Sequence, residues 1–460
     1  MRKKRPIGID LFAGAGGLSL GFEQAGFDVM AAVEVDPIHA AIHEFNFPHC
    51  VVLPQSVADL TGKKIREAAK IGDRGVDVVF GGAPCQGFSL IGQRAFDDPR
   101  NQLVKDFVRL VKELDASYFL FENVKGLTVG RHRQFLEEVI SEFAAIGYQV
   151  RSPWQVLNAS AYGVPQERER LILLGAKAGL DLPNYPVPFT RSAGKNKGNL
   201  PICPTCEDAL GDLPEAEDYE ILFDQDYVLT PNWGKPSPYA RQMRCLEDKF
   251  WYFGYRRSFE PNLLTASTRT HRSFEPNLLT ASTRTHHTAI SRRRFAATPP
   301  GTTEPISRFF RLPRHGVSHT LRAGTDASRG AFTSPRPIHY EKARCITVRE
   351  MARLHGFPDW FRFHSTKWHG ARQIGNAVPP PLARAIALEI IKVLGITPSK
   401  PKEIIQLGDP QVLQMVMSEA AQYWGIPNPI GKRDRASGAK KRKQEDIERL
   451  LLSIEATKND

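Results

Sequence analysis

The feature that most constrains the fold is a regular alternation of two hydrophobic periodicities in the N-terminal part of the chain. From Pro6 to about Ala176, short runs rich in β-branched residues alternate with segments whose apolar residues recur every three or four positions. Strands and helices that alternate in this way form a parallel sheet wrapped by helices, because each helix carries the chain back to the end where the next strand begins. We therefore expect a doubly wound, Rossmann-like α/β domain.

The individual elements of this domain can be placed from the same pattern. Strands are predicted at Ile7–Phe12, Val29–Val35, Val76–Phe80, Tyr118–Phe121 and Leu171–Leu174. Helices are predicted at Leu18–Ala25, Pro37–Phe45, Gln102–Leu114 and Arg133–Ile146. In the third helix Leu103, Phe107, Leu110 and Leu114 fall on one face, as expected for a helix that covers a sheet.

A second, smaller and irregular lobe is expected after this domain. Past Asp181 the alternation gives way to Pro-, Thr- and Arg-rich sequence that extends to about Pro337. Such sequence contains many turns and few long helices. A helix over Gln373–Leu394 then follows. At 460 residues the chain is long enough for two lobes, since single cores stop growing well below this size.

Positive charge is concentrated in the second lobe. The chain carries a formal net charge of +12, and the stretch Arg241–Arg336 alone contains sixteen arginines and one lysine against six acidic residues. A guanidinium suits both phosphates and guanine edges, whereas a face that is only solvated would use lysine as readily. The composition favours a nucleic-acid partner, and a solvated loop face is the alternative.

The composition also excludes several classes of protein. No apolar run approaches the about 20 residues that cross a bilayer. The basic start Met1–Arg5 is followed by Asp10 and glycines and not by the apolar stretch of a signal peptide. The six cysteines are few and irregularly spaced, which argues for a reducing compartment and against a disulfide framework. We expect a soluble, cytoplasmic protein.

A glycine-rich turn follows the first predicted strand, in Asp10–Gly21 (DLFAGAGGLSLG). Ser19 stands where the dinucleotide fingerprint has its third glycine, which makes a pyrophosphate less expected than a nucleoside cofactor. Glu34, at the end of the second predicted strand, is suited to accept both hydroxyls of an unphosphorylated ribose. A glycine turn that is packed tightly without any ligand is the alternative.

The most specific segment is Gly81–Ser89 (GGAPCQGFS), directly after the predicted strand Val76–Phe80. A cysteine in a turn at the end of a strand is exposed, whereas a structural cysteine is usually buried. The segment resembles the Pro-Cys catalytic loop of the cytosine carbon-5 DNA methyltransferases. It departs from that family in one position, since Ala83 stands where the family often has a second proline.

Four further blocks resemble the same family and occur in the family's order. They are Phe121–Val124 (FENV), Gln166–Arg170 (QERER), Arg349–Pro358 (REMARLHGFP) and Gln373–Pro379 (QIGNAVP). The resemblance covers nearly all of residues 7–176 and 344–394 and is patchy between them. It implies a monomeric DNA (cytosine-5-)-methyltransferase of the bacterial restriction-modification type. Such an enzyme acts on double-stranded DNA with S-adenosylmethionine as cofactor, and a cognate restriction endonuclease would act separately.

The chemistry of this reaction needs these residue types. Carbon 5 of cytosine is a poor nucleophile, so a thiolate such as Cys85 must first add to carbon 6. Glu122, in a desolvated pocket that raises its pKa, would protonate nitrogen 3. Arg170, together with Arg168, would hold the carbonyl oxygen of the base. Carbon 6 is inaccessible in a stacked duplex, so the cytosine must be flipped out. The sequence nominates no base for the carbon-5 proton, and water is one candidate.

The same resemblance implies a cofactor pocket. Phe12 would lie against the adenine or the methionine, Asp10 and Gly14 near the amino-acid end, and Glu34 at the ribose. Asp59 resembles the acidic residue that reads the adenine amino group. The rest of the pocket would comprise Gly16, Pro84, Leu103, Asn376 and Ala377, although Leu103 fits a core position equally well.

These assignments divide the chain into four segments. Residues 1–180 form the catalytic and cofactor-binding domain, residues 181–340 the target-recognition lobe, residues 341–396 a return segment that completes the catalytic domain, and residues 397–460 a basic C-terminal tail. We refer to residues 181–340 as the second lobe. The tail ends in a basic run between Lys432 and Lys443, which fits a nucleic-acid arm or a solvated chain equally well.

Two local features have no assigned role. Arg257–His271 (RSFEPNLLTASTRTH) is repeated at once and identically in Arg272–His286, which indicates a duplicated loop or a sequence error, since two units are too few for a solenoid. Cys203 and Cys206 have the spacing of half a zinc site, but a second ligand pair is missing, and we predict no metal.

Three other functions compete with this interpretation. A related transfer-RNA methyltransferase shares the catalytic blocks but usually has a shorter middle region. A catalytically inert DNA-binding protein would not need Cys85, Glu122, Arg168 and Arg170 together. An oxidoreductase fits poorly, because the glycine spacing is wrong for a dinucleotide.

Overall fold

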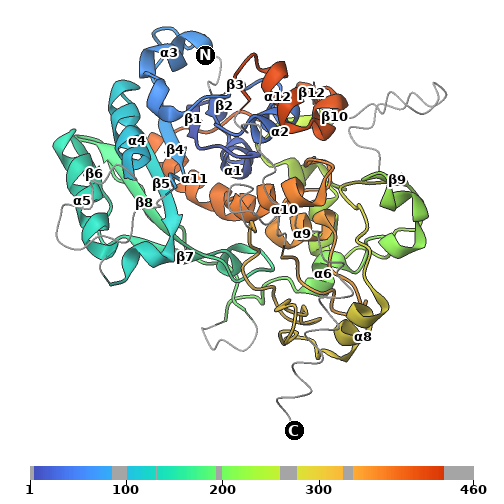
Figure 1. Ribbon diagram of the computed structural model, residues 1–460. Helices are drawn as coiled ribbons and strands as arrows, with labels where there is room; N and C mark the ends of the chain where they lie inside the picture. Colours follow the sequence, from blue (N-terminus) through green and yellow to red (C-terminus); the bar gives the residue numbers. More distant parts are fainter. Residues whose placement is uncertain are drawn as a thin grey trace, which may run out of the picture.

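The central element is a mixed β-sheet of eight strands. The computed structural model describes residues 5–84, 101–130, 132–192, 199–258, 277–324 and 335–428. The strand order is β3-β2-β1-β4-β5-β8-β6, and β7 also pairs with β8 (Figure 1). The strands are β1 Ile7–Leu11, β2 Asp28–Val33, β3 Val51–Leu53, β4 Val78–Gly81, β5 Tyr118–Val124, β6 Tyr148–Val150, β7 Gln155–Asn158 and β8 Glu169–Lys177. The predicted doubly wound, Rossmann-like α/β fold is confirmed.

The sheet is parallel from β3 to β5 and antiparallel beyond it. β8 runs antiparallel to β5, and both β6 and β7 run antiparallel to β8. β6 therefore has the direction of β5, as a crossover through a helix requires, and β8 inserts between them from the opposite end. The sheet is thus mostly parallel, as expected, with an antiparallel edge that the strand pattern did not indicate. The short strands β6 and β7, which turn the chain around before β8, are the reason.

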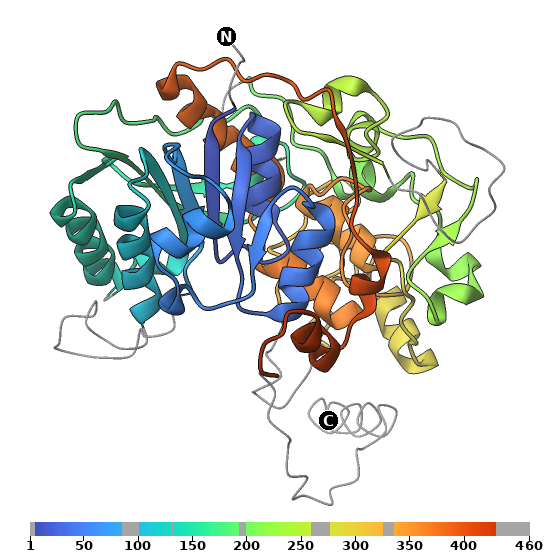
Figure 2. The same ribbon diagram turned by 90° about the horizontal axis from the view of Figure 1, so that it is seen from above.

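Helices cover both faces of the sheet, as Figure 2 shows from above. α1 Gly17–Ala25, α2 Pro37–Asn46 and α11 Pro380–Leu394 pack on one face, whereas α3 Gly62–Ala68, α4 Gln102–Glu113 and α5 His132–Ala145 pack on the other. Successive strand residues point to opposite faces, so each strand contributes to both cores. Phe80 of β4 stacks on Phe22 of α1, and Phe119 of β5 stacks on Phe143 of α5. The ring centroids lie 3.8 Å apart in each pair.

Two helices, α10 and α11, occupy the region around the single helix predicted over Gln373–Leu394. α10 spans Lys367–Asn376 and ends before Pro379, and α11 begins at Pro380. A proline lacks the backbone N–H and clashes with the preceding turn, so consecutive prolines interrupt the helix predicted over Gln373–Leu394. α11 then packs closely on α1. A Cβ at Gly21 would lie 2.4 Å from the Cβ of Ala383, so only glycine permits this approach.

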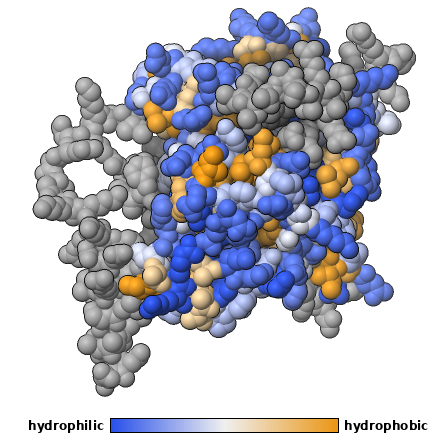
Figure 3. All heavy atoms as spheres, turned by 90° about the vertical axis from the view of Figure 1, so that its right-hand side faces the viewer, coloured by the Kyte–Doolittle hydropathy of each residue, from blue (hydrophilic) through white to orange (hydrophobic). Residues whose placement is uncertain are grey.

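The second lobe consists of short elements on a core that it shares with the sheet. Its described elements are α6 Cys206–Leu210, β9 Val228–Leu229, α7 Pro238–Met243, β10 Arg256–Ser258, β11 Leu278–Leu279 and α8 Ala289–Ala297. Leu210, Met243 and Leu312 belong to the same buried cluster as Phe22 of α1. The face of the molecule that carries β9 and α8 is mostly hydrophilic (Figure 3). The lobe also has two small buried clusters of its own, around Leu222 and around Phe295.

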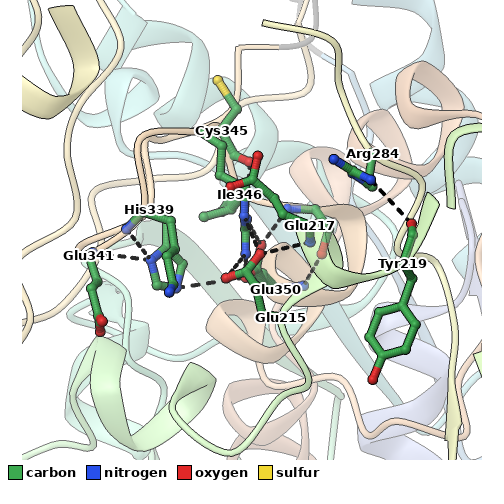
Figure 4. Close-up of polar contacts among 12 residues, drawn as sticks. Glu215, Glu217, Tyr219, Arg284, His339, Glu341, Cys345, Ile346 and Glu350 are labelled. Carbon is green, nitrogen blue, oxygen red and sulfur yellow. Dashed lines mark hydrogen bonds and ion pairs between the residues drawn. The ribbon is translucent and has the colours of Figure 1, made fainter. Parts of the chain in front are cut away.

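α9 Val348–His355 connects the two parts of the molecule, and all eight of its residues are buried. Arg353 forms ion pairs with Asp212 and Asp359. Arg344 donates two hydrogen bonds of 2.9 Å to Glu350 and pairs at 2.8 Å with Glu215 of the second lobe. Figure 4 shows Glu215 and Glu350 at the centre of this network, with His339 to one side.

The charges around α9 are well compensated. Burial alone would raise the pKa of Glu350. The Arg344 guanidinium beside the carboxylate more than offsets this effect and lowers the pKa to about 2. Removing one partner of a buried ion pair leaves the other charge uncompensated, so this network fixes how the second lobe sits on α9.

The beginning of the predicted C-terminal tail is folded. Within residues 397–428, β12 Ile404–Gln406 pairs with β10, and α12 Met417–Tyr423 packs on α2. The Trp424 indole N–H donates to Pro37 O at 3.0 Å. Apolar side chains such as Leu407 and Leu413 anchor this segment in the shared core, a pattern too short to stand out in the sequence. The basic run between Lys432 and Lys443 lies outside the described residues.

Two further sequence features can be placed only in part. The structure describes Arg257 and Ser258 of the first repeat and Asn277–His286 of the second, and the rest of both copies lies outside the described residues. Among the helices that are described, none combines the length and the hydropathy of a membrane span.

Candidate active site

A cavity of about 600 Å³ lies at the carboxyl-terminal edge of the sheet. It is bordered by the residues that follow β1, β2, β4 and β5 and by the turn between α10 and α11. In the strand order, β1 and β4 are neighbours from which the chain proceeds in opposite directions, and ligands of doubly wound sheets bind at such a switch point. The cavity is therefore the position at which this fold accepts a small molecule.

Most of the residues predicted to bind the cofactor line this cavity. They are Phe12, Gly14, Glu34, Pro84, Leu103, Asn376 and Ala377. Two segments of the N-terminal part of the chain thus meet a third that lies more than 200 residues further along it. Leu103, which the sequence could not assign, lies both on the cavity and against the core under α4.

Glu34 is held in a fixed position at the cavity. One carboxylate oxygen accepts the backbone N–H of Gly14 at 2.8 Å, and the other accepts that of Asp36 at 2.9 Å. Burial raises the pKa of Glu34 above its ordinary value. Each carboxylate oxygen can accept a second hydrogen bond, so the side chain is preorganised to receive hydroxyl groups of a ligand.

Asp10 does not line the cavity, although it was predicted near the cofactor. Its carboxyl group is fully buried under α1, where it accepts the Ser19 hydroxyl at 2.6 Å. Its second oxygen is buried and has no hydrogen-bond partner among the described residues. Burial raises the pKa of Asp10 to about 8, and the neighbouring Glu34 contributes to the rise.

Gly16 and Asp59 also lie outside the cavity lining. Gly16 has φ +106°, and a Cβ there would lie 2.4 Å from the Phe47 ring, so this glycine is needed for the turn itself. Asp59 is exposed at the end of the short 3-10 helix Val57–Asp59. The cavity is instead lined by Ser56 and Val57 of the same segment.

Glu122 and Arg170 form an ion pair on the cavity wall. They come from the neighbouring strands β5 and β8, and Arg170 Nε lies 2.8 Å from Glu122 Oε1. Both side chains are nearly buried, with exposed fractions of 13% and 12% for Arg170 and Glu122. Burial raises the pKa of Glu122, and the attraction of Arg170 and Arg168 opposes the rise without cancelling it. The raised pKa favours the protonated form of the carboxyl group, which is the form that can donate a proton.

The backbone that leads to Cys85 lies directly against this carboxyl group. A Cβ at Gly82 would be 2.4 Å from Glu122 Oε2, so a larger residue here would displace the Glu122 carboxyl group. Pro84 is exposed at the cavity, and the Asn123 amide donates to Ala83 O at 3.1 Å. Asn123 was quoted in a motif but given no role, and its place beside Glu122 was the available signal. Cys85 itself lies outside the described residues.

Arg168 borders the cavity, but its terminal nitrogens are engaged elsewhere. It is only 1% exposed, and it donates to Leu321 O at 3.1 Å, Gly375 O at 2.8 Å and Ala377 O at 2.9 Å. Arg168 directly precedes β8 and therefore connects the start of this strand to the second lobe and to the α10–α11 turn. Arg170 is the arginine that faces Glu122.

Most described arginines of the stretch Arg241–Arg336 form ion pairs or hydrogen bonds with other residues of the protein. Ion pairs join Arg241 to Glu247, Arg244 to Asp212, Arg256 to Asp248, Arg257 to Glu23, Arg284 to Glu220, Arg292 to Glu217, Arg294 to Glu304 and Arg314 to Glu207. Arg311 and Arg336 are buried and donate to backbone carbonyls. Arg293, Arg308 and Arg322 are exposed and form no ion pair with a described residue. The net charge of the stretch thus overstates its free cationic surface.

Two cysteines and one histidine complete the description of the predicted sites. Cys203 and Cys206 are buried, and the Cys203 thiol donates to Val164 O at 3.1 Å. Burial raises the pKa of Cys203 to about 12, which keeps it a thiol. His39 of α2 lines the cavity, and no sequence signal pointed to it.

The comparisons with known proteins agree with this geometry. Residues 8–392 match the family model described as C-5 cytosine-specific DNA methylase. The chain is 55% identical over 426 residues to the Type II methyltransferase M.XorII of Xanthomonas oryzae pv. oryzae, covering 93% of this chain and 94% of that protein. It is 33% identical to the Type II methyltransferase M1.HphI of Haemophilus parahaemolyticus, covering 84% and 86% of the two chains.

A solved structure shows the same similarity in three dimensions. It is a DNA modification methyltransferase encoded within a prophage of E. coli, with a TM-score of 0.65 and 32% identity, and the match covers 85% of this chain and 99% of that one. The family model spans most of the chain and includes every block that borders the cavity. The chain therefore belongs to the C-5 cytosine-specific DNA methylase family.

Proposed function

We propose that this DNA cytosine-5 methyltransferase binds S-adenosylmethionine in the cavity and uses Cys85, Glu122 and Arg170 on a cytosine flipped out of double-stranded DNA. The observation that carries the proposal is the Glu122–Arg170 ion pair, which lies on the cavity wall beside the backbone that leads to Cys85. A proton donor, a cation and the start of the nucleophile loop therefore share one cavity.

The cavity has the chemical features that this cofactor needs. Its volume of about 600 Å³ is in the range of sites that enclose a small molecule. Phe12 offers an aromatic ring, and Glu34 offers two oriented acceptors for the ribose hydroxyls. Gly14, Pro84, Leu103, Asn376 and Ala377 would form the remaining contacts. The bound cofactor would supply the methyl group, and these side chains would orient it toward the base.

The residues of the chain would then act on the cytosine in sequence. The Cys85 thiolate forms a bond to carbon 6 with its electron pair, and Glu122 donates its proton to nitrogen 3 as charge moves onto the ring. Arg170 orients Glu122 and neutralises the carboxylate that remains. After methylation of carbon 5, nitrogen 3 returns its proton to Glu122. A base, with water as one candidate, then removes the carbon-5 proton. The electrons of that C–H bond form the double bond between carbons 5 and 6, and Cys85 leaves carbon 6 as a thiolate with the electrons of the C–S bond.

We infer indirect roles in this scheme for Arg168, Asp10, Gly16 and Asp59. Arg168 would keep the walls of the cavity together, and Asp10 and Gly16 would shape the turn that carries Gly14. Asp59 would reach an adenine amino group only through a rearrangement of the exposed segment on which it lies. These four residues are therefore secondary to the cavity-lining set.

We also infer the biological setting from the relatives. The named relatives are Type II methyltransferases, so we infer that this enzyme protects DNA against a separate restriction endonuclease. We also propose, as the sequence resemblance implies, a monomer that acts in the cytoplasm. We propose residues 1–180 and 341–396 as the catalytic domain and residues 181–340 as the target-recognition lobe.

Bisulfite sequencing of DNA from cells that express the chain tests the proposal. We expect 5-methylcytosine at one position of a single short sequence throughout the genome. Cells that express the Glu122→Gln variant at the same level are the control and should show little methylation. An unmethylated genome in cells with the folded wild-type protein would contradict the proposal.

A further inference from the structure

A buried polar cluster joins four segments of the chain next to the cavity. Gln166 precedes β8, His355 ends α9, Ala377 lies between α10 and α11, and Leu321 belongs to the second lobe. Gln166 Nε2 lies 2.9 Å from His355 Nδ1, and His355 Nε2 lies 3.0 Å from Ala377 O. The Gln166 and His355 side chains are completely buried. Neither of them lines the cavity, whereas Ala377 does.

The hydrogen-bond pattern fixes the protonation state of this cluster. The backbone N–H of Leu321 donates to Gln166 Oε1 at 3.0 Å, so the amide group must turn its N–H₂ toward His355 Nδ1. His355 Nδ1 is then an acceptor, and Nε2 must carry the proton that is donated to Ala377 O. Only the neutral imidazole with its proton on Nε2 satisfies both contacts. Burial, together with Arg168 and Arg170, lowers the pKa of His355 in agreement with this state.

Ala377 O is the point where this cluster meets the arginine described above. It accepts a hydrogen bond from His355 Nε2 and another from Arg168 Nη2 at 2.9 Å. Arg168 also donates to Leu321 O, and Gln166 accepts from Leu321 N. Both polar groups of the Leu321 backbone and the Ala377 carbonyl are thus held by side chains from residues 166–168 and by His355.

We propose that His355 and Gln166 are positioning residues of the methyltransferase. They hold the cavity wall at Asn376 and Ala377 in a fixed position relative to the strand that carries Arg170. They also connect this wall and this strand to the second-lobe segment at Leu321. The inference rests on the proposed cofactor pocket, because its consequence is measured there. Neither residue lines the cavity, so each acts through the backbone that it holds.

Side-chain replacements distinguish positioning from simple packing. His355→Leu fills much of the volume but removes both hydrogen bonds, and it leaves the Gln166 N–H₂ and the Ala377 carbonyl without these partners. His355→Gln offers an oxygen to Gln166 and an N–H to Ala377 O, so it can replace the imidazole. His339→Leu is the matched control, because His339 is also buried but lies near the opposite end of α9, beside Glu350.

The test is calorimetric binding of S-adenosylhomocysteine, together with the melting temperature of each purified variant. We expect His355→Leu to raise the Kd about tenfold, and His355→Gln to stay within about threefold of the wild type, as expected for one buried hydrogen-bond pair. His339→Leu should lower the melting temperature and leave the Kd unchanged.

Other outcomes have distinct meanings. A lower melting temperature with an unchanged Kd in His355→Leu would assign His355 to packing and overturn the inference. If His355→Leu does not fold, His355→Asn decides, because its amide is one methylene shorter than that of His355→Gln and should bind the ligand more weakly. Equal Kd values for these two variants would then overturn the inference. A wild-type protein that does not bind S-adenosylhomocysteine would instead contradict the proposed pocket.

Discussion

Arg170 Nε lies 2.8 Å from Glu122 Oε1, and this contact joins the antiparallel pair of strands at which the sheet changes direction. The antiparallel insertion of β8 places Arg170 opposite Val124, so its side chain reaches back toward Glu122. Burial favours the neutral acid, whereas the guanidinium favours the carboxylate. Glu122 can therefore be present as an acid that donates a proton, and Arg170 stabilises the carboxylate that remains after donation.

Replacement of this acid should remove proton donation while keeping the shape of the site. We expect Glu122→Gln to slow single-turnover methylation by about 10²–10⁴-fold, the usual contribution of a positioned acid. Glu169→Gln is the control, because Glu169 lies next to Arg170 but is exposed and paired with Lys125. In the wild type the rate should fall as pH rises through the raised pKa of Glu122, since the acid form is then lost. An unchanged rate in Glu122→Gln would exclude Glu122 as the proton donor.

Cys85→Ser should abolish methyl transfer and leave the fold and cofactor binding intact. A hydroxyl is a far weaker nucleophile than a thiolate, and the change in size is small. The control is Cys245→Ser, because burial raises the pKa of Cys245 far above that of a reactive thiol. The measurement is transfer of a labelled methyl group to DNA. Near-normal turnover of Cys85→Ser would contradict covalent catalysis.

The sequence predicted five strands of the sheet and missed three short ones. β1, β2, β4, β5 and β8 lie within a few residues of the predicted strands. β4 has only four residues but contains the continuous apolar run Val78–Phe80, which made it recognisable. The three-residue strands β3 and β6 and the four-residue strand β7 were not predicted, because their few residues show no clear periodicity. The antiparallel edge of the sheet depends on two of them and was missed for the same reason.

The functional site shows a similar division. Motifs brought Glu122, Glu34 and Asn376 to one cavity, because each motif ends an element at the same edge of the sheet. The sequence could not predict which arginines pair with carboxylates of the same chain and which face solvent. Arg257 pairs with Glu23, a residue 234 positions away, and only the tertiary fold decides whether an arginine meets such a partner or solvent. A count of arginines therefore predicts a basic surface less well than it predicts total charge.

Asp10 should make stability depend on pH. Its pKa is about 8 in the fold and about 4 in an unfolded chain. The folded state therefore keeps a proton that the unfolded state releases, and the stability that Asp10 contributes at acidic pH is lost as pH rises from about 4 to about 8. Asp10→Asn cannot ionise. We expect the melting temperature of the wild type, relative to this variant, to fall across that range.

The wild type and Asp10→Asn contain the same other titrating groups. The difference between their melting temperatures therefore reports the titration of Asp10 alone. A difference in melting temperature that stays constant between pH 4 and pH 8 would show that the Asp10 proton is not retained on folding. The variant is expected to fold, because the asparagine oxygen can still accept the Ser19 hydroxyl.

Deletion of Arg272–His286 should leave the chemistry and the sequence preference largely unchanged. The described contacts use Arg257 and Ser258 from the first copy and Asn277–His286 from the second. Because the copies are identical, the shortened chain still contains each of these residue types in the same order. Bisulfite sequencing and the methylation rate are the measurements. Methylation of a different sequence would show that the duplicated segment contacts bases.

The final prediction is that recognition of DNA depends on exposed second-lobe arginines that form no ion pair with a described residue. Arg322 is exposed and follows Leu321, whose carbonyl accepts a hydrogen bond from Arg168 beside the cavity. Arg322→Ala should weaken DNA binding, by about 1–3 kcal/mol at one position if it contacts a base, or at all sequences with a smaller salt dependence if it contacts a phosphate. Arg241→Ala is the control, because Arg241 is paired with Glu247 and should have little effect. Equal losses in the two variants would show that internal pairing does not decide which arginines meet DNA.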